Sequence, residues 1–123
     1  MDLFSRLLLL VAGLMGAAGV AAAAAAAHVG GGENLATASH FLLFDAAAVA
    51  GLVAVALQLG RGRAALSIAA GLITVGGLLF SGDLAARALM EVKLLGGSAP
   101  FGGSLMIVGW LVAAVAALFA KKA

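Results

Sequence analysis

Five side chains that can bind protons, ions or metals stand beside or inside long apolar stretches of the sequence. They are His28, His40, Asp45, Asp83 and Arg87. Asp45 is the most unusual, because the apolar stretch around it is long enough to cross most of a bilayer. An ionisable group in hydrocarbon is costly unless it is paired, hydrated or protonated. We therefore treat the five residues as a candidate polar cluster, in which Asp45 pairs with Arg87 or with a histidine.

Three roles for Asp45 stay open at this level. The carboxyl group can form a static buried hydrogen bond that fixes helix packing, belong to a proton relay or ion site, or stay protonated near the membrane interface. His40 and Asp45 are five residues apart and so lie on different faces of a helix, and a shared metal would also need His28 or Asp83. We expect no metal and no cofactor, and interfacial histidines without a ligand role.

Four apolar stretches must position these groups. Hydrophobic residues make up 65% of the 123 residues and charged residues only 10%, whereas soluble domains carry about 25% charged residues. Each stretch is close to the ~20 residues that a helix needs to cross a bilayer, and none alternates as a barrel strand does. We predict an all-α integral membrane bundle of four transmembrane helices in one domain, residues 1–123. The predicted helices are about 4–27, 38–59, 64–95 and 100–120.

Two further patterns concern how these helices pack and end. Small residues let membrane helices approach closely, so we expect helix-packing roles for Gly13, Gly16, Gly71, Gly102, Gly103 and Gly109, and small contact positions at Gly19, Gly76 and Gly77. Asp83, Arg87 and Glu91 recur every four residues, which predicts a solvated ladder of alternating charge where the third helix leaves the membrane. Thr37 or Ser39 is the expected cap of the second helix.

The basic residues predict an orientation. One set belongs to the chain ends and the turn between the second and third helices: Arg6, Arg61, Arg63, Lys121 and Lys122. The opposite side holds only Arg87 and Lys93. Because cytoplasmic loops carry the excess of Lys and Arg, we predict that both termini are cytoplasmic. The apolar first stretch is interpreted as a membrane helix and not as a cleaved signal peptide.

Several function classes find no support in the sequence. The absence of cysteine excludes disulfides and thiolate chemistry. There is no phosphate-binding loop, no HExxH and no nucleophile elbow. The net charge is only +2, without a basic block that would suggest nucleic acid. We therefore expect a protein that is not an enzyme. Trp110, in the middle of the fourth helix, is expected to be a packing residue.

A family resemblance rests on four motifs in order. They are Ala27-His28, Thr37-Ala38, Leu79-Phe80-Ser81-Gly82, and Ala99-Pro100-Phe101-Gly102-Gly103 followed by Gly109-Trp110. With them the chain resembles the domain of unknown function 423 (YgdD-like) family of small bacterial membrane proteins over nearly its whole length. The family commonly has histidine where this chain has Asp45 and glycine where it has Val29, so any role of that histidine does not transfer. The resemblance implies four membrane helices in the bacterial inner membrane and no established activity.

Two functional hypotheses follow. The first is a multi-pass inner-membrane protein that works by association, as an accessory or stabilising subunit of a larger complex or as a small oligomer. Its expected partners are the lipid bilayer and other membrane subunits or further copies of itself. The alternative is a small transporter or channel-like protein that moves protons or ions with Asp45 as its intramembrane polar group.

Overall fold

Four long helices make up most of the chain. The computed structural model describes all 123 residues. Its elements are α1 (Leu3–His28), α2 (Gly32–Ala56), β1 (Leu59–Arg61), α3 (Arg63–Met90), the 3₁₀ turn η1 (Leu94–Gly96), α4 (Ala99–Phe119) and β2 (Lys121–Lys122). Each of the four α-helices is long and apolar enough to span a membrane. The predicted all-α architecture with four membrane helices is confirmed.

Short polar or glycine positions set where the helices begin. The Asp2 carboxylate accepts a hydrogen bond from the Ser5 backbone N–H (2.8 Å) and caps α1, and its hydrogen bonds with Ser5 lower the pKa of Asp2. Gly31 and Gly62 precede α2 and α3, each with a φ of 91°. This left-handed backbone suits glycine, which has no Cβ to clash, so both turns are tight.

Two predicted helix ends are wrong. The second helix begins at Gly32 and not near residue 38, so neither Thr37 nor Ser39 caps it. The third helix ends at Met90 and not near Leu95, because Glu91 adopts a left-handed conformation with a φ of 57°. The chain then folds back through η1, and Glu91 lies outside the helix. The predicted charge ladder therefore reduces to Asp83 and Arg87, and the prediction that it is solvated is wrong, because Asp83 is fully buried.

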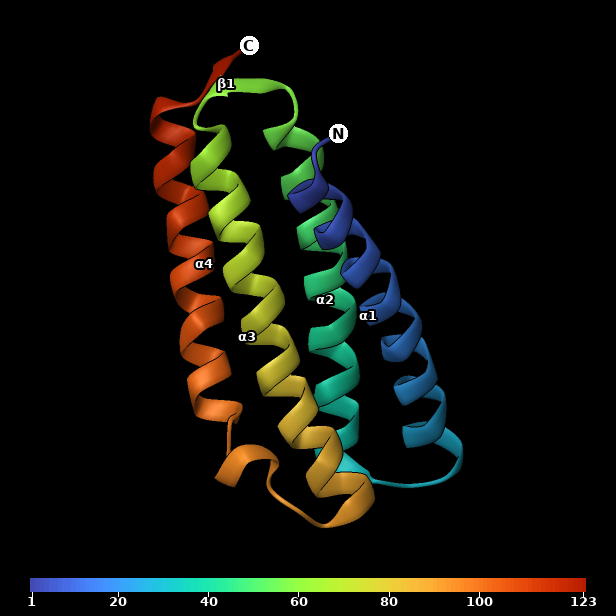
Figure 1. The fold of residues 1–123 in the computed structure, drawn as a ribbon. Helices are drawn as coiled ribbons and strands as arrows, with labels where there is room; N and C mark the ends of the chain where they lie inside the picture. The colour runs from blue at the N-terminus through green and yellow to red at the C-terminus, as the bar shows by residue number, and fades with distance from the viewer.

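The helices stand in a row rather than in a closed square. Figure 1 shows α1, α2, α3 and α4 side by side in chain order. α2 packs between α1 and α3, α1 also touches α3, and α4 packs mainly against α3. One buried apolar cluster joins the first three helices and consists of Leu8, Ala12, Val49, Val53, Ala70 and Ile73. A smaller one, Ala56, Leu66 and Ala116, joins α2 and α3 to α4.

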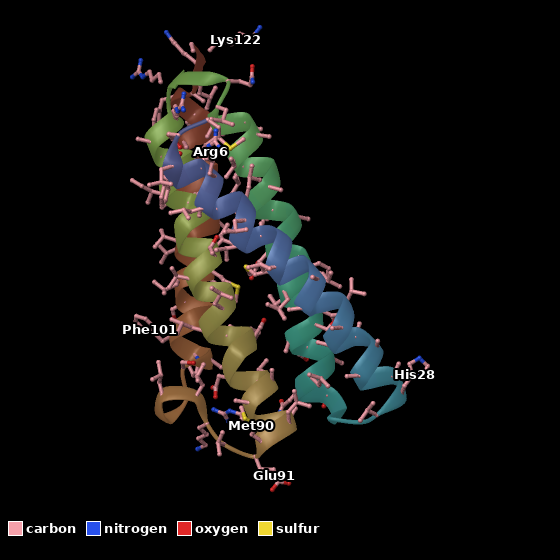
Figure 2. All side chains as sticks on the ribbon, turned by 45° about the vertical axis from the view of Figure 1, so that its right-hand side comes forward. Arg6, His28, Met90, Glu91, Phe101 and Lys122 are labelled. Carbon is pink, nitrogen blue, oxygen red and sulfur yellow. The ribbon has the colours of Figure 1, made fainter.

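Both chain termini lie at the same end of the bundle along the helix axes. β1 pairs with β2 in antiparallel register, Leu59 opposite Lys122 and Arg61 opposite Lys121. Arg63 approaches the Asp2 carboxylate at 3.5 Å. Figure 2 shows Arg6 and Lys122 at this end and His28, Met90 and Glu91 at the other. The shared end of the termini agrees with the prediction, and the side of the membrane on which it lies stays a prediction.

Candidate functional site

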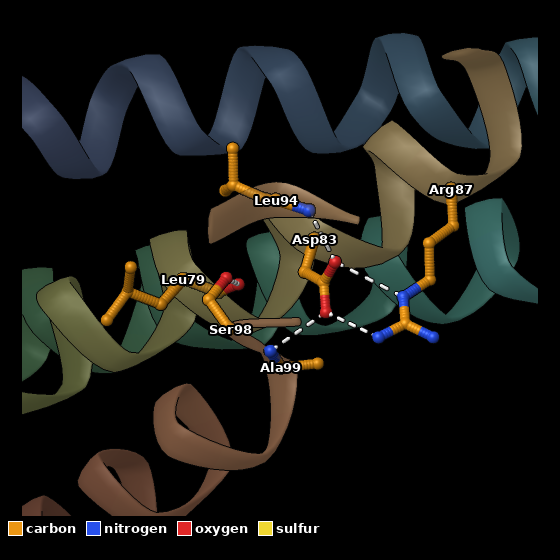
Figure 3. A network of polar contacts seen from close by, with 6 residues as sticks. All are labelled: Leu79, Asp83, Arg87, Leu94, Ser98 and Ala99. Carbon is orange, nitrogen blue, oxygen red and sulfur yellow. Dashed lines mark hydrogen bonds and ion pairs between the residues drawn. The ribbon is translucent and has the colours of Figure 1, made fainter. Parts of the chain in front are cut away.

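Asp83 forms the most extensive polar contact of the protein. Its side chain is fully buried near the end of α3. Arg87, one turn later, donates from Nε to Oδ1 (3.2 Å) and from Nη2 to Oδ2 (3.0 Å). Figure 3 shows the guanidinium lying against both carboxylate oxygens. This two-pronged geometry is the strong form of an ion pair, and the spacing of four residues made it visible in the sequence.

The same carboxylate holds the connection between α3 and α4. The backbone N–H of Leu94 donates to Oδ1 and that of Ala99 to Oδ2, each at 2.9 Å. Ala99 begins α4, whose N-terminus has no side-chain cap of its own, so Asp83 supplies the negative charge that a helix N-terminus favours. The four donors use the acceptor sites of both oxygens. We interpret the pair as a structural clamp and not as a reactive group.

Ser98 completes this clamp from the other side of the chain reversal. Its hydroxyl donates to the Leu79 carbonyl oxygen at 2.8 Å and ties the start of α4 to α3. Sequence reasoning missed Ser98. A serine just before Ala99-Pro100 signals a helix start, because serine is a preferred N-cap and proline suits the first turn, but its contact with Leu79 depends on the tertiary fold.

Asp45 is buried without the predicted ionic partner. Only 2% of the residue is exposed, and its Oδ2 makes no hydrogen bond. The predicted ion pair with Arg87 is wrong, because Arg87 binds Asp83. A histidine partner is wrong as well: His28 is exposed at the end of α1, and His40 is exposed and stacks on Phe44 with ring centroids 6.1 Å apart. The structure therefore divides the predicted polar cluster.

The depth of Asp45 also differs from expectation. A second helix starting near residue 38 would put Asp45 roughly 10 Å below the outer boundary at ~1.5 Å per residue. Because α2 starts at Gly32, Asp45 lies about 20 Å from that end and about 17 Å from Ala56. The carboxyl group is thus at the middle of the helix. No three His, Asp or Glu side chains come together as metal ligands.

Asp45 fits beside α3 only because residue 77 is glycine. A Cβ built on Gly77 would collide with Asp45 Oδ2 and stand 3.2 Å from Met15 Cε. The carboxyl group therefore lies between α1 and α3, against the bare backbone of Gly77. Ser81, one turn further along α3, is also fully buried, and its Oγ makes no hydrogen bond. In the sequence, Ser81 stood out only as part of a motif.

The predicted packing glycines differ in how closely they approach neighbours. A Cβ on Gly102 would stand 2.5 Å from the Gly76 carbonyl oxygen, and one on Gly109 would stand 2.8 Å from Ile73 Cγ1. These are the tight contacts of α3 with α4. Gly16, Gly71 and Gly103 stand at ordinary contact distances, whereas Gly13 has nothing within 4 Å, so its predicted packing role is wrong within this chain.

Gly19 brings α1 close to α2, as its small size predicts. A Cβ at this position would lie 2.7 Å from Leu43 Cγ. The carbonyl oxygen of Gly19 also accepts a hydrogen bond from the Ser39 hydroxyl at 2.8 Å. Ser39 thus fastens α2 to α1, in place of the capping role that the sequence suggested.

Comparisons with known proteins agree with a membrane protein. The sequence profile of the family described as "Protein of unknown function (DUF423)" matches residues 15–103. UPF0382 membrane proteins of two Staphylococcus epidermidis strains are each 40% identical over 68 residues, which cover 55% of this chain and 56% of theirs. A UPF0382 membrane protein of Staphylococcus haemolyticus is 36% identical over 62 residues, which cover 50% of this chain and 51% of the relative. The chain thus spans about half the length of these curated relatives. No solved structure matches it significantly.

Proposed function

We propose that this chain, which belongs to the family described as Protein of unknown function (DUF423), is a membrane protein without catalytic activity that works by association. In this proposal it is an accessory or stabilising subunit of a larger membrane complex, or a small oligomer, in the bacterial inner membrane. The four apolar helices and the relatives named as membrane proteins support the membrane part of the proposal. The surface of the helix row supports the rest.

A groove between α2 and α4 is the observation that carries the proposal. Because α4 packs mainly against α3, a cavity of about 530 Å³ remains between α2 and α4, above Leu66 of α3. A second cavity of about 230 Å³ lies between Phe41 of α2, Phe80 of α3 and the first half of α4. Trp110 lines both cavities, so they adjoin at this side chain, and we call the two together the α2–α4 groove.

The lining of this groove favours a helix as its occupant. Small residues contribute much of the wider part, namely Ala48, Gly51, Ala113, Ala117 and Ala120. In membranes, association depends on close packing rather than on hydrophobic burial, and small residues allow backbones to approach. Trp110 is half-exposed at the junction of the two cavities, and a rigid aromatic side chain at the centre of a contact surface is a typical anchor.

The cavities favour association over ion movement. A transporter that used Asp45 would expose this carboxyl group to a hydrated passage at some stage. Four of the five cavities are lined almost entirely by apolar residues, the fifth also by Ser39 and His40, and Asp45 lines none of them. The α2–α4 groove, by contrast, is already open. The α2–α4 groove therefore supports association more than ion movement.

A matched pair of glycine substitutions tests this proposal. Gly51 lines the groove and Gly13 lines no cavity, and a Cβ added at either glycine would meet no atom within 4 Å. A leucine at residue 51 starts in open space and projects into the groove, so we expect Gly51→Leu to abolish the assembly and Gly13→Leu to keep it. The measurement is native mass spectrometry after mild detergent extraction from native membranes. A wild-type protein that is monomeric without partners, or an assembly that survives Gly51→Leu, would contradict the proposal.

A further inference from the structure

Asp45 is enclosed by groups that carry no charge. Its Oδ2 lies against the backbone of Gly77 on α3, and Met15 of α1 approaches the same glycine. Along α3, the nearest ionisable group is Asp83, six residues beyond Gly77, and its oxygens are already used by four donors. On α2 itself His40 is exposed on another face. No cation on any neighbouring element can compensate a negative charge at Asp45.

The surrounding backbone accepts hydrogen bonds but has none to donate. In the middle of an α-helix each N–H is bonded to the carbonyl oxygen four residues earlier, while that oxygen keeps a second lone pair. An ionised carboxylate only accepts hydrogen bonds, so the helix backbone offers it no donor, and the Ser81 hydroxyl is the one unpaired buried donor nearby. A buried ion with so little compensation is strongly disfavoured. A protonated carboxyl group has an O–H that can donate. The site therefore suits the acid form.

Ser81 supplies the second polar group of the site. Gly77 and Ser81 are four residues apart on α3, so their side-chain positions lie on one face about 5–6 Å apart. The Asp45 oxygen occupies almost the place of a side chain on Gly77. One water molecule with two hydrogen bonds of about 2.8 Å holds two oxygen atoms about 4.5–5.5 Å apart, and a buried water commonly satisfies such polar atoms.

We propose that Asp45 is an intramembrane proton-binding site, which holds its proton at neutral pH and is joined to Ser81 by one buried water molecule. The ligand is a proton, bound between α1, α2 and α3. The α2–α4 groove does not contribute to this site, so the proposal is independent of the association function. The failure of one leaves the other in place.

Carboxyl NMR on the wild-type protein tests the proton. The chain contains three aspartates, Asp2, Asp45 and Asp83, so ¹³C-labelling of aspartate gives three side-chain carboxyl signals in lipid vesicles. We expect one signal of a protonated carboxyl group at neutral pH, lost in Asp45→Asn. Asp83→Asn, with a different aspartate removed, keeps it and gives the assignment even where Asp45→Asn does not fold. Three carboxylate signals at neutral pH, or a protonated signal that belongs to Asp83, would overturn the proposal.

Magnetisation transfer from water protons to the Asp45 carboxyl carbon tests the bridge. We expect transfer in the wild-type protein and its loss in Ser81→Ala, with the protonated signal retained. Ser104→Ala is the matched control, because the Ser104 hydroxyl is exposed and donates to the Pro100 carbonyl oxygen within α4. Absence of transfer in the wild-type protein, or transfer that persists in Ser81→Ala, would show that Ser81 holds no water for Asp45.

Discussion

The two buried aspartates of this protein differ in how their carboxyl groups are compensated. Asp83 is compensated by a guanidinium and two backbone N–H groups. Asp45 has no donor at Oδ2, which lies against Gly77. A buried charge is tolerated only when it is paired and hydrogen-bonded. Asp83 meets that condition and can be buried as an anion. Asp45 does not meet it, so it suits burial only as a neutral acid.

Removal of the charge at Asp83 is expected to loosen the α3–α4 connection. Asp83→Asn keeps the size of the side chain but removes the ion pair and replaces one acceptor oxygen by a donor. A buried N–H without an acceptor costs about 1–3 kcal/mol, and hydrogen bonds to a charged group are lost as well. We expect the free energy of unfolding in detergent to fall by about 2–4 kcal/mol.

The control for this prediction is the other acid of the same segment. Glu91 is exposed and forms no ion pair, so Glu91→Gln should change the free energy of unfolding by less than about 0.5 kcal/mol. Thermal unfolding followed by circular dichroism provides both values. Equal stability of the two variants would mean that Asp83 does not hold the connection.

At the scale of the residue, the sequence predicted contacts within one helix better than contacts between helices. The Asp83–Arg87 pair follows from a spacing of four. The isolation of Asp45 does not, because it depends on where α2 begins. The Gly30–Gly32 run suggests the start of a longer loop, but α2 begins directly at Gly32. Asp45 therefore lies near the middle of α2.

At the scale of the element, the sequence predicted the number of helices better than where each helix ends. Apolar length alone predicted the four helices, since each stretch must span ~30 Å of hydrocarbon. The end of α3 could not be predicted in this way. It depends on a left-handed Glu91 and on the hydrogen bond from the Leu94 N–H to Asp83, and no local propensity signals either feature.

Two adjacent glycines of α4 are expected to respond oppositely to the same substitution. A Cβ on Gly102 would stand 2.5 Å from the Gly76 oxygen and from the Phe80 nitrogen, whereas one on Gly103 would stand 3.7 Å from Phe80 Cδ1. Gly102→Ala must push α4 away from α3 and should cost about 1–3 kcal/mol. Gly103→Ala gains up to about 1 kcal/mol of helix propensity without a clash.

The measurement is the midpoint of thermal unfolding of both variants in one detergent. We expect a lower midpoint for Gly102→Ala and an unchanged or higher midpoint for Gly103→Ala. The two variants have the same composition and adjacent positions, so differences in detergent binding are small. A lower midpoint for both, or for neither, would show that the α3–α4 contact is not as close as described.

At the scale of the whole molecule, charge separates the two ends of the helix row. The end that carries the termini shows Arg6 and Lys122 in Figure 2. It also carries Arg61 and Lys121, which pair in the small sheet, and Arg63, which forms an ion pair with Asp2. At the other end Arg87 is paired with Asp83, which leaves Lys93 as the basic residue without an ion pair there. The folded structure therefore sharpens the charge asymmetry that the sequence alone indicated. It also places the small β1–β2 pair at the basic end, where it joins the turn after α2 to the C-terminus.

This asymmetry predicts the orientation in the membrane, with the basic end in the cytoplasm. Because the chain has no cysteine, single cysteines report on each end without background. Ala123→Cys lies at the basic end and Leu95→Cys at the opposite end, and both positions are exposed. In intact bacterial cells, a maleimide that does not cross the inner membrane should label Leu95→Cys and leave Ala123→Cys unlabelled until the membrane is opened. Labelling of Ala123→Cys in intact cells would reverse the orientation, and equal labelling of both would mean that the helix row does not span the membrane in one fixed direction.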